Sequence, residues 1–380
     1  MNKILYLNLQ NKEITVQAGI RWADIVKNIS PFRLAIRAMQ SFNDFSVCGS
    51  LGVNVHGQDV ENAPLIKTVK SIKLVMPDGS VINASRDENY DIFKAAIGGY
   101  GLIGIIVEAT LKLTDDALMK RKSVALDSSK LGGFISKLDA CDNIHFFSAR
   151  FSVGPSDFMQ KALAVTYEEA EGEQDAKFYN LAQPSALILQ KPIFSLFSQF
   201  NNLKDYRFDL ERLYFGQSKI ISRNNFMNFS ISSLPTDTPE GMYILQEYFI
   251  PYSNLSGFIA KMRPLMRNYP DANILNISAR HVNQDAESLM AYSRQDTCAL
   301  VLYIYQPKDL AKYNKTVEWT RKLIDLALEC DGTYYLPYQL IATKDQFKKS
   351  YPRFSEFLDI KNSLDPACVL TNRLFESYFI

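Results

Sequence analysis

Two glycine-rich segments constrain the possible folds of this chain more than any other feature of its sequence. The first is Ser46 to Gly57 (SVCGSLGVNVHG) and the second is Gly98 to Ile106 (GGYGLIGII). Small residues let the main chain approach a ligand closely and offer its N–H groups to phosphate oxygens. Glycine-rich segments beside strands are also often only tight turns or bulges, so both interpretations stay open. Neither segment places a G-x-G-x-x-G pattern between a strand and a following helix, and no P-loop pattern occurs, so the common nucleotide motifs are not supported.

Hydrophobic periodicity in the first 114 residues switches between the repeat of strands and that of a helix. Trp22, Ile25, Val26 and Ile29 recur at the spacing of one helical face, which predicts an amphipathic helix. The Asp78-Gly79 pair tolerates positive φ and predicts the turn of a hairpin. The expected strands are Ile4–Leu9, Glu13–Gln17, Ser71–Met76, Val81–Ala84 and Ile105–Leu113, and the expected helices are Trp22–Ile29 and Asn89–Ile97.

The length of 380 residues favours about two domains. Near Thr114 glycine becomes rarer while charged and aromatic residues become more frequent, so we expect a boundary there. Strand-like runs with helical stretches between them predict a mostly antiparallel sheet covered by helices. The runs are Ile220–Ser222, Leu245–Ile250, Ile274–His281 and Cys298–Tyr305, with helical segments at Thr316–Leu328 and Lys344–Leu364. The sequence therefore predicts an α+β protein divided into residues 1–114, 115–330 and a C-terminal segment at 331–380.

The charge balance gives no sign of a polyanionic partner. There are 42 basic and 41 acidic side chains, a net charge of +1, so binding of nucleic acid is not expected. Five scattered cysteines without a C-x-x-C pair favour reduced thiols. We find neither a signal peptide nor an apolar run long enough to span a bilayer, and therefore expect a cytoplasmic protein. The apolar stretch Ala186–Phe200 is either a peripheral membrane contact or the end of a core helix or a loop.

Metal chemistry and serine-nucleophile chemistry find no support. No group of His, Cys, Asp and Glu residues has the spacing of metal ligands, so no metal site is expected. A G-x-S-x-G elbow is also missing from the sequence. Three histidines are present, and His145 is most economically a core residue with satisfied hydrogen bonds.

Three ordered motifs carry a resemblance to a known superfamily. The pattern V-x-G-S-L-x-V-N-x-H-G, followed by a hairpin and then G-G-Y-G-L-I-G-I-I, closely resembles the FAD-binding, PCMH-type fold of the vanillyl-alcohol oxidase superfamily. The run Gly332–Tyr338 with Tyr351-Pro352 and Asp365-Pro366 resembles the C-terminal ends of decaprenylphosphoryl-ribose oxidases and aldonolactone oxidases. Gln246–Pro251 is similar to a strand of their substrate domain. The resemblance covers nearly the whole chain.

The resemblance implies a non-covalent FAD and assigns residues to it. These are Ser46, Cys48, Gly49, Ser50, Gly52, Asn54, His56, Gly57, Gly101, Gly104, Ile106 and Tyr335. Segment Ser46–Asn54 would line the pyrophosphate and the ring system, His56 would lie close to the rings, and Gly104 with Ile106 would meet the adenine end. Cys48 replaces a glycine of the superfamily pattern. An N-terminal subdomain with its own phosphate-binding loop would precede Ile4, so the resemblance implies a PCMH-type domain truncated at its N-terminus.

His281, Glu247 and Tyr338 are the catalytic candidates. His281 follows Arg280 in a strand, and alternation places the two side chains on opposite faces, so only one can readily point at a ligand. His281 is a proton acceptor, a substrate anchor or a structural residue. The resemblance aligns Glu247 with a substrate-facing position, where it binds a substrate hydroxyl or accepts its proton; the alternative is a solvated strand carboxylate. Tyr338 takes the place where the resemblance implies a lysine near the flavin.

The resulting hypothesis is an FAD-dependent oxidoreductase. It would oxidise a CH–OH group of a sugar, polyol or aldonolactone-like small molecule by hydride transfer to flavin N5, and pass electrons to oxygen or another acceptor. The alternative is a truncated, catalytically silent remnant that serves as a binding or scaffolding module.

Overall fold

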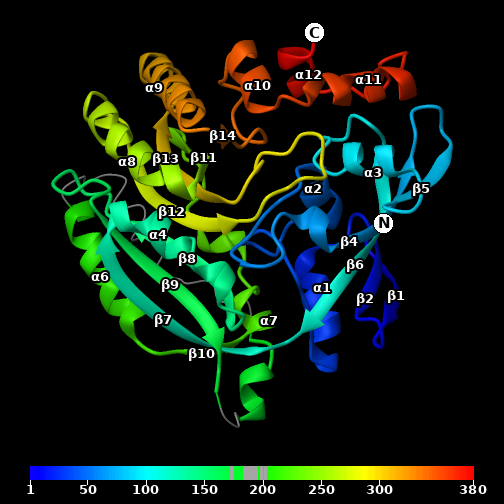
Figure 1. Ribbon diagram of the computed structural model, residues 1–380, viewed down its shortest axis with the longest axis horizontal. Coiled ribbons are helices and arrows are strands. Elements are labelled where there is room, and N and C mark those ends of the chain that lie inside the picture. The colour runs from blue at the N-terminus through cyan, green and yellow to red at the C-terminus, as the bar shows by residue number, and fades with distance from the viewer. Residues whose placement is uncertain (172–174, 183–195, 197–199, 201–202) are drawn as a thin grey trace.

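The structure is a computed structural model that describes residues 1–380 except 172–174, 183–195, 197–199 and 201–202 (Figure 1). Of the apolar stretch Ala186–Phe200, all but Leu196 and Phe200 therefore lies outside the described residues. Among the helices that are described, none is long and apolar enough to cross a membrane.

The first region is built around a six-stranded antiparallel sheet. Its path runs β1-β2-β6-β4-β5, and β3 pairs with β6 beyond that path. The strands are β1 (Ile4–Asn8), β2 (Glu13–Gln17), β3 (Leu34–Ile36), β4 (Val69–Val75), β5 (Val81–Ser85) and β6 (Ile105–Asp115), and the helices are α1 (Trp22–Ile29), α2 (Val47–Gly52) and α3 (Tyr90–Ala96). Helix α1 has the predicted bounds, and its four periodic apolar residues are buried in the core. Both predicted hairpins are confirmed by the pairing of β1 with β2 and of β4 with β5.

The second region is an eight-stranded antiparallel sheet whose order is β10-β7-β9-β8-β12-β13-β11-β14. Its strands are β7 (Leu118–Asp127), β8 (Ile144–Phe151), β9 (Lys161–Glu169), β10 (Ile220–Ser222), β11 (Gly241–Pro251), β12 (Ile274–Val282), β13 (Thr297–Pro307) and β14 (Thr333–Tyr334). The mostly antiparallel sheet and the α+β class are therefore as predicted. Strands β7, β8 and β9 were not among the predicted runs.

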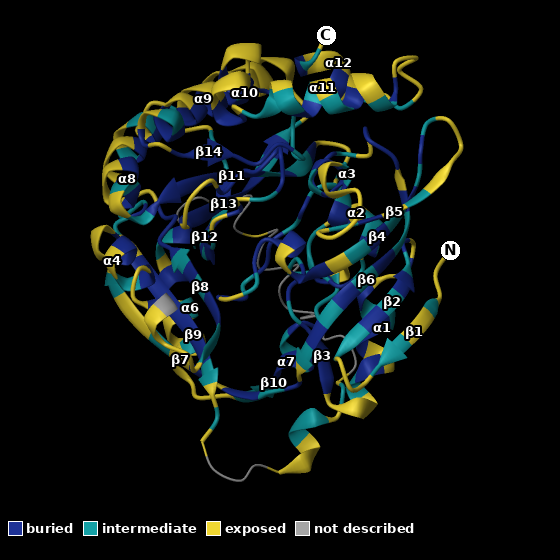
Figure 2. Cartoon of the chain, turned by 45° about the vertical axis from the view of Figure 1, so that its right-hand side comes forward, coloured by how far each residue is buried: buried dark blue, intermediate teal, exposed yellow. Residues whose placement is uncertain are grey.

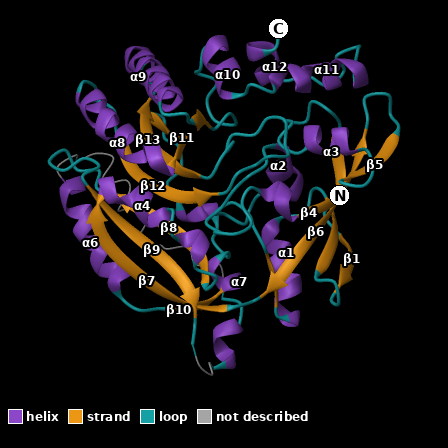
Figure 3. Cartoon of the chain, in the orientation of Figure 1, coloured by secondary structure: helices purple, strands orange, loops and turns teal. Residues whose placement is uncertain are grey.

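The two faces of this sheet have different neighbours. Helices α8 (Tyr252–Arg267) and α9 (Leu310–Glu329) cover one face, where Tyr248 contacts Phe258 of α8 and Gln246 donates to Thr320 of α9 at 2.6 Å (Figures 1 and 3). We call this the helix-covered face. Because side chains alternate along a strand, Glu247 and Phe249 point to the opposite face, which we call the site face.

Helix α6 (Lys204–Gly216) packs over another part of the site face. Its Arg207 donates to the side chain of Asn276 at 2.8 Å. Asn276 pairs with Tyr303, which in turn pairs with Leu245, so it lies on the same face as Glu247. Helix α6 therefore covers the part of the site face around Asn276. The part around Glu247 faces the first region instead.

The C-terminal segment returns to the first region. The predicted helical segment Lys344–Leu364 is divided into α10 (Lys344–Ser350) and α11 (Phe354–Leu364), because Pro352 interrupts it. A 2.9 Å hydrogen bond runs from Asn372 to the Tyr100 carbonyl, beside α3. The other α-helices in the described part of the chain are α4 (Leu131–Ile135), α7 (Arg223–Phe226) and α12 (Arg373–Tyr378). Figure 2 shows buried segments in both sheets and where the two regions face each other.

A buried ion pair also joins the two regions. Arg223 of α7 contacts Asp59 of the first region, and both side chains are only 3% exposed. Its Nε atom donates to the carbonyl of Ile36 at 3.0 Å. Breaking such a pair leaves an uncompensated buried charge, so this contact resists separation of the two regions.

Candidate active site

The segment Ser46–Gly57 contains a short helix in place of the open phosphate-binding loop that its composition suggests. The side chain of Ser46 caps α2 by accepting the N–H of Gly49 at 3.2 Å. The N–H of Cys48 donates to the carbonyl of Ala18 at 2.8 Å. These N–H groups are already bonded within the protein, which corrects the expectation that they are offered to a pyrophosphate.

The residues assigned to FAD by resemblance lie in three kinds of place. Those at least partly exposed are Ser46, Cys48, Gly49, Gly52 and Gly101. Those buried against other parts of the protein are Ser50, Asn54, Gly57, Gly104 and Ile106. His56 and Tyr335 are buried where the first region meets the second sheet and the C-terminal segment.

Packing explains why several of the buried residues that the resemblance assigns to FAD are small. A Cβ atom on Gly57 would lie 2.1 Å from the carbonyl oxygen of Met39, and one on Gly104 would lie 3.2 Å from that of Val75. Ser50 accepts a 2.8 Å hydrogen bond from the Trp22 indole. The structure therefore gives these residues packing roles and corrects their assignment to the cofactor. Ile106, 4% exposed, is part of the hydrophobic core.

His56 and Glu247 form the centre of the site. The Nε2 atom of His56 lies 2.8 Å from Oε1 of Glu247, and both side chains are 2% exposed. His56 comes from the loop after α2 and Glu247 from the site face of β11. The other ring nitrogen, Nδ1, is buried without a hydrogen-bond partner among the described residues. A buried polar atom in this condition calls for an explanation.

Three aromatic rings surround His56. Its ring centroid lies 5.3 Å from that of Phe249, 5.7 Å from that of Tyr292 and 5.9 Å from that of Tyr335. Tyr335 also donates to the carbonyl of Val53 at 3.0 Å. These rings exclude water and fix the position of the imidazole.

Glu247 is held as a carboxylate. Burial alone would raise its pKa, but the charge that His56 carries when protonated and its contact with Oε1, the charge of Arg280 and the hydroxyl of Tyr338 outweigh burial, so the pKa of Glu247 is below its ordinary value. Tyr338 donates to Oε2 at 3.2 Å. Burial, followed by the negative charge of Glu247, raises the pKa of Tyr338 well above its usual range, so this hydroxyl keeps its proton.

Arg280 lies on the site face, and His281 does not. Arg280 pairs across β13 with Ala299, which pairs with Phe249, so these three side chains point the same way. No described residue forms a hydrogen bond or an ion pair with the Arg280 guanidinium. The sequence predicts that only one of Arg280 and His281 can readily point at a ligand, and the strand register places Arg280 on the site face.

His281 is buried on the helix-covered face. Its Nδ1 contacts the hydroxyl of Tyr252 in α8, and its Nε2 lies 2.8 Å from the amide nitrogen of Asn283. Both ring nitrogens are bonded in this way, and its side chain is 0% exposed. The structure therefore supports the structural interpretation of His281 and corrects its assignment to catalysis.

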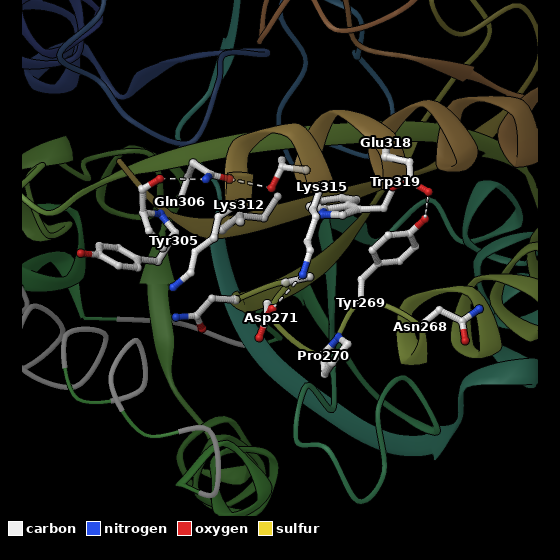
Figure 4. A pocket seen from close by; sticks show the side chains of 15 residues that line it. Asn268, Tyr269, Pro270, Asp271, Tyr305, Gln306, Lys312, Lys315, Glu318 and Trp319 are labelled. Carbon is white, nitrogen blue, oxygen red and sulfur yellow. Dashed lines mark hydrogen bonds and ion pairs between the residues drawn. The ribbon is translucent and has the colours of Figure 1, made fainter. Parts of the chain in front are cut away.

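A separate pocket of about 160 Å³ lies beside β13 and α9, away from this site (Figure 4). Its polar side chains largely bond to one another: Lys315 lies 3.4 Å from Asp271, and Thr316 donates to Gln306 at 2.6 Å. None of the residues predicted to be functional lines it. The described part of the chain also contains no group of three or more His, Cys, Asp or Glu residues that could hold a metal ion.

Comparison with known proteins identifies two matching families. Residues 1–85 match the family described as FAD binding domain, and residues 187–378 match the family described as D-arabinono-1,4-lactone oxidase. L-gulonolactone oxidase from Mus musculus is 21% identical over the whole chain and 84% of its own length. A mitochondrial L-galactono-1,4-lactone dehydrogenase 2 from Oryza sativa subsp. japonica is 34% identical over 30% of this chain and 20% of its own length.

The fold and these matches define the class of protein: a flavin-dependent oxidoreductase of the PCMH type, with FAD as its cofactor. More narrowly, the chain belongs to the D-arabinono-1,4-lactone oxidase family, whose match spans half of its residues. The predicted superfamily, FAD dependence and enzymatic class are thereby confirmed. A catalytically silent module is not favoured.

The residues present fit a bound flavin at one place. A Cβ atom on Gly52 would meet nothing within 4 Å, and Gly49 is exposed, so α2 presents a bare surface to a flat ring. Four residues after Gly52, the buried Nδ1 of His56 has no hydrogen-bond partner among the described residues, and a bound ligand would satisfy it. These residues would hold the ring system, whereas the N–H groups of the first turn of α2 would not hold phosphate.

Proposed function

We propose that this protein oxidises a CH–OH group of an aldono-1,4-lactone and that His56 accepts the hydroxyl proton. The observation that carries the proposal is a buried imidazole with one nitrogen against a carboxylate and the other without a partner in the described part of the chain. The relatives are named as oxidases or dehydrogenases of gulono-, galactono- and arabinono-lactones, which supports a lactone as the substrate.

The Glu247 carboxylate determines which nitrogen of His56 can act as a base. A ring nitrogen 2.8 Å from an ionised carboxylate carries its proton toward that carboxylate, so in the neutral ring Nδ1 holds the lone pair. The hydroxyl proton of the substrate would move to Nδ1, and the positive charge that develops on the ring would be stabilised by Glu247. When bound, FAD supplies the hydride acceptor, its N5 atom, for the carbon that carries the hydroxyl.

Arg280 and Tyr338 give the site its polarity. Arg280 has donors without a described hydrogen-bond or ion-pair partner, and its charge acts on Glu247, so it would hold a carbonyl or hydroxyl oxygen of the lactone. Tyr338 holds the second oxygen of Glu247 and keeps the carboxylate turned toward His56. Oxygen or another acceptor would then take the electrons.

The test is oxidation of defined lactones by the FAD-loaded protein. We expect turnover with L-gulono-, L-galactono- or D-arabinono-1,4-lactone, measured with an artificial electron acceptor with and without oxygen. The matching open-chain aldonates should be poorer substrates, because ring opening frees the carbon chain, and ordering that chain on binding costs free energy. Loaded protein that bleaches with none of the lactones would contradict the proposal.

Glu247→Gln tests the role given to the carboxylate. The variant should still bind FAD but lose at least about tenfold in kcat, because an amide stabilises a developing imidazolium less well than a carboxylate. Glu108→Gln is the matched control, since Glu108 pairs with Lys73 at 2.6 Å on the first sheet. Equal kcat values for the two variants would remove Glu247 from the mechanism.

A further inference from the structure

The connection between β12 and β13 is longer than these neighbouring strands require. A hairpin needs about two to five residues, whereas residues 283–296 leave the sheet and cross to the first region. The yellow trace in Figure 1 shows this crossing toward α2 and α3. The N–H of Leu289 donates to the carbonyl of Lys94 at 3.2 Å, and Glu287 pairs with Arg86 at 2.7 Å. The connection is therefore anchored at its far end.

Asn54 is the residue that this connection holds most completely. It has a left-handed backbone, with φ of +46°, and stands two residues before His56. Its side-chain nitrogen donates to Asp285 at 2.9 Å, and its side-chain oxygen accepts the N–H of Ile66 at 2.9 Å. Its carbonyl accepts the hydroxyl of Tyr292 at 2.6 Å. Every polar group of its side chain is satisfied by protein, so its assignment to the cofactor is corrected.

Tyr292 contacts residues of the first region, of β11 and of the C-terminal segment. Its ring centroid lies 5.7 Å from that of His56, 4.4 Å from that of Phe249 and 4.9 Å from that of Tyr335. Its carbonyl accepts the hydroxyl of Thr333 in β14. Only 1% of Tyr292 is exposed, so its hydroxyl has no water to replace the Asn54 carbonyl.

These contacts fix both the position and the direction of the His56 ring. The left-handed backbone of Asn54 sets the direction in which the chain leaves α2. Tyr292 donates to the Asn54 carbonyl, and its ring also contacts the His56 imidazole. We propose that Tyr292 is the positioning residue of the active site, which holds His56 so that Nε2 meets Glu247 and Nδ1 faces the substrate. This inference rests on the proposed role of His56.

The test uses the three histidines as probes of their own surroundings. In FAD-loaded and FAD-free protein labelled at histidine, the imidazole NMR signals are compared between wild type, Tyr292→Phe and Tyr248→Phe. Tyr248 is the matched control, because it is equally buried, donates to Gln246 at 2.6 Å and lies on the helix-covered face. Phenylalanine keeps the ring, so a shift of the His56 signal reports a change in its geometry.

We expect Tyr292→Phe to shift the His56 signal and to leave those of His145 and His281 in place, while Tyr248→Phe leaves His56 unchanged. In turnover, Tyr292→Phe should lower kcat about tenfold or more with KM within about twofold, because a misplaced base slows the chemical step.

An unmoved His56 signal, or an equal shift in Tyr248→Phe, would overturn the proposal. If Tyr292→Phe does not fold, Asp285→Asn decides by the same His56 signal. If wild type oxidises no lactone, the proposed function fails, but the NMR comparison still tests the positioning.

Discussion

Two histidines buried at the large sheet differ in how their ring nitrogens are bonded. His281, on the helix-covered face, has both nitrogens bonded to Tyr252 and Asn283 within its own region. His56 meets the site face of the same sheet from another region, with one nitrogen against Glu247 and the other without a described partner. Both are almost completely buried, so burial alone does not distinguish them.

The hydrogen bonding of a buried polar group indicates whether it contributes to stability or to chemistry. A group that is fully bonded contributes to stability, because removing it leaves its partners unsatisfied. A group with an unsatisfied lone pair beside an ionised partner costs stability, and we propose that His56 is retained for the transfer of a proton. The comparison therefore predicts that His56 variants lose activity and that His281 variants lose stability.

His56→Gln should have the largest effect. Loss of a general base typically lowers kcat by about 10²–10⁴-fold, and the variant should also shift the flavin spectrum or weaken flavin binding, since it removes a group beside the ring system. The measurements are turnover with the preferred lactone and titration with FAD. His145→Gln is the control. Equal spectra, affinities and rates in the two variants would refute the placement of His56.

His281→Leu should lose stability and keep its chemistry. Leaving the buried Tyr252 hydroxyl and the Asn283 amide without this partner should cost roughly 2–4 kcal/mol of unfolding free energy. Urea unfolding measures that loss, and kcat per folded, FAD-loaded molecule should stay within about twofold of wild type. A stable His281→Leu protein with a large loss of kcat would reverse the comparison.

The sequence predicted the elements whose signal is local. Helix α1 has its predicted bounds because Trp22, Ile25, Val26 and Ile29 form one apolar face, and β11 to β13 follow from long β-branched and aromatic runs. The break between α10 and α11 was missed, although Pro352 marks it. Strands β7 to β9 mix charged with apolar residues and gave a weaker pattern.

The site was harder to predict because it depends on which residues face each other across strands. Alternation separates Arg280 from His281, but only the register Arg280–Ala299–Phe249 shows which of them reaches the site face. Tyr292 lies in a connection without periodicity, so no sequence pattern marked it. His56 and Glu247 were both selected from the resemblance, but their direct contact required the fold.

His145 provides the smallest and most specific test of the comparison. It is half-buried and, contrary to expectation, its Nε2 has no partner in the described residues, yet no carboxylate contacts its ring as Glu247 contacts that of His56. Burial, reinforced by the charge of Arg223 and opposed by Glu169, Asp59 and Glu61, lowers the pKa of His145 below its ordinary value. Below about pH 6.5, His145 therefore binds a proton more readily in the unfolded chain than in the folded protein. Its contribution to the free energy of unfolding falls as pH decreases through that range.

His145→Gln should reduce this fall without affecting turnover. Unfolding free energies at pH 7 and pH 5 measure the effect, and the variant should lose less stability than wild type between them, because glutamine takes up no proton. Wild type and variant should be similar at pH 7.5, where histidine is neutral in both states. If His145→Gln instead lowered kcat as strongly as His56→Gln, an unpartnered ring nitrogen would be sufficient to mark a catalytic histidine, and the carboxylate beside His56 would lose its significance.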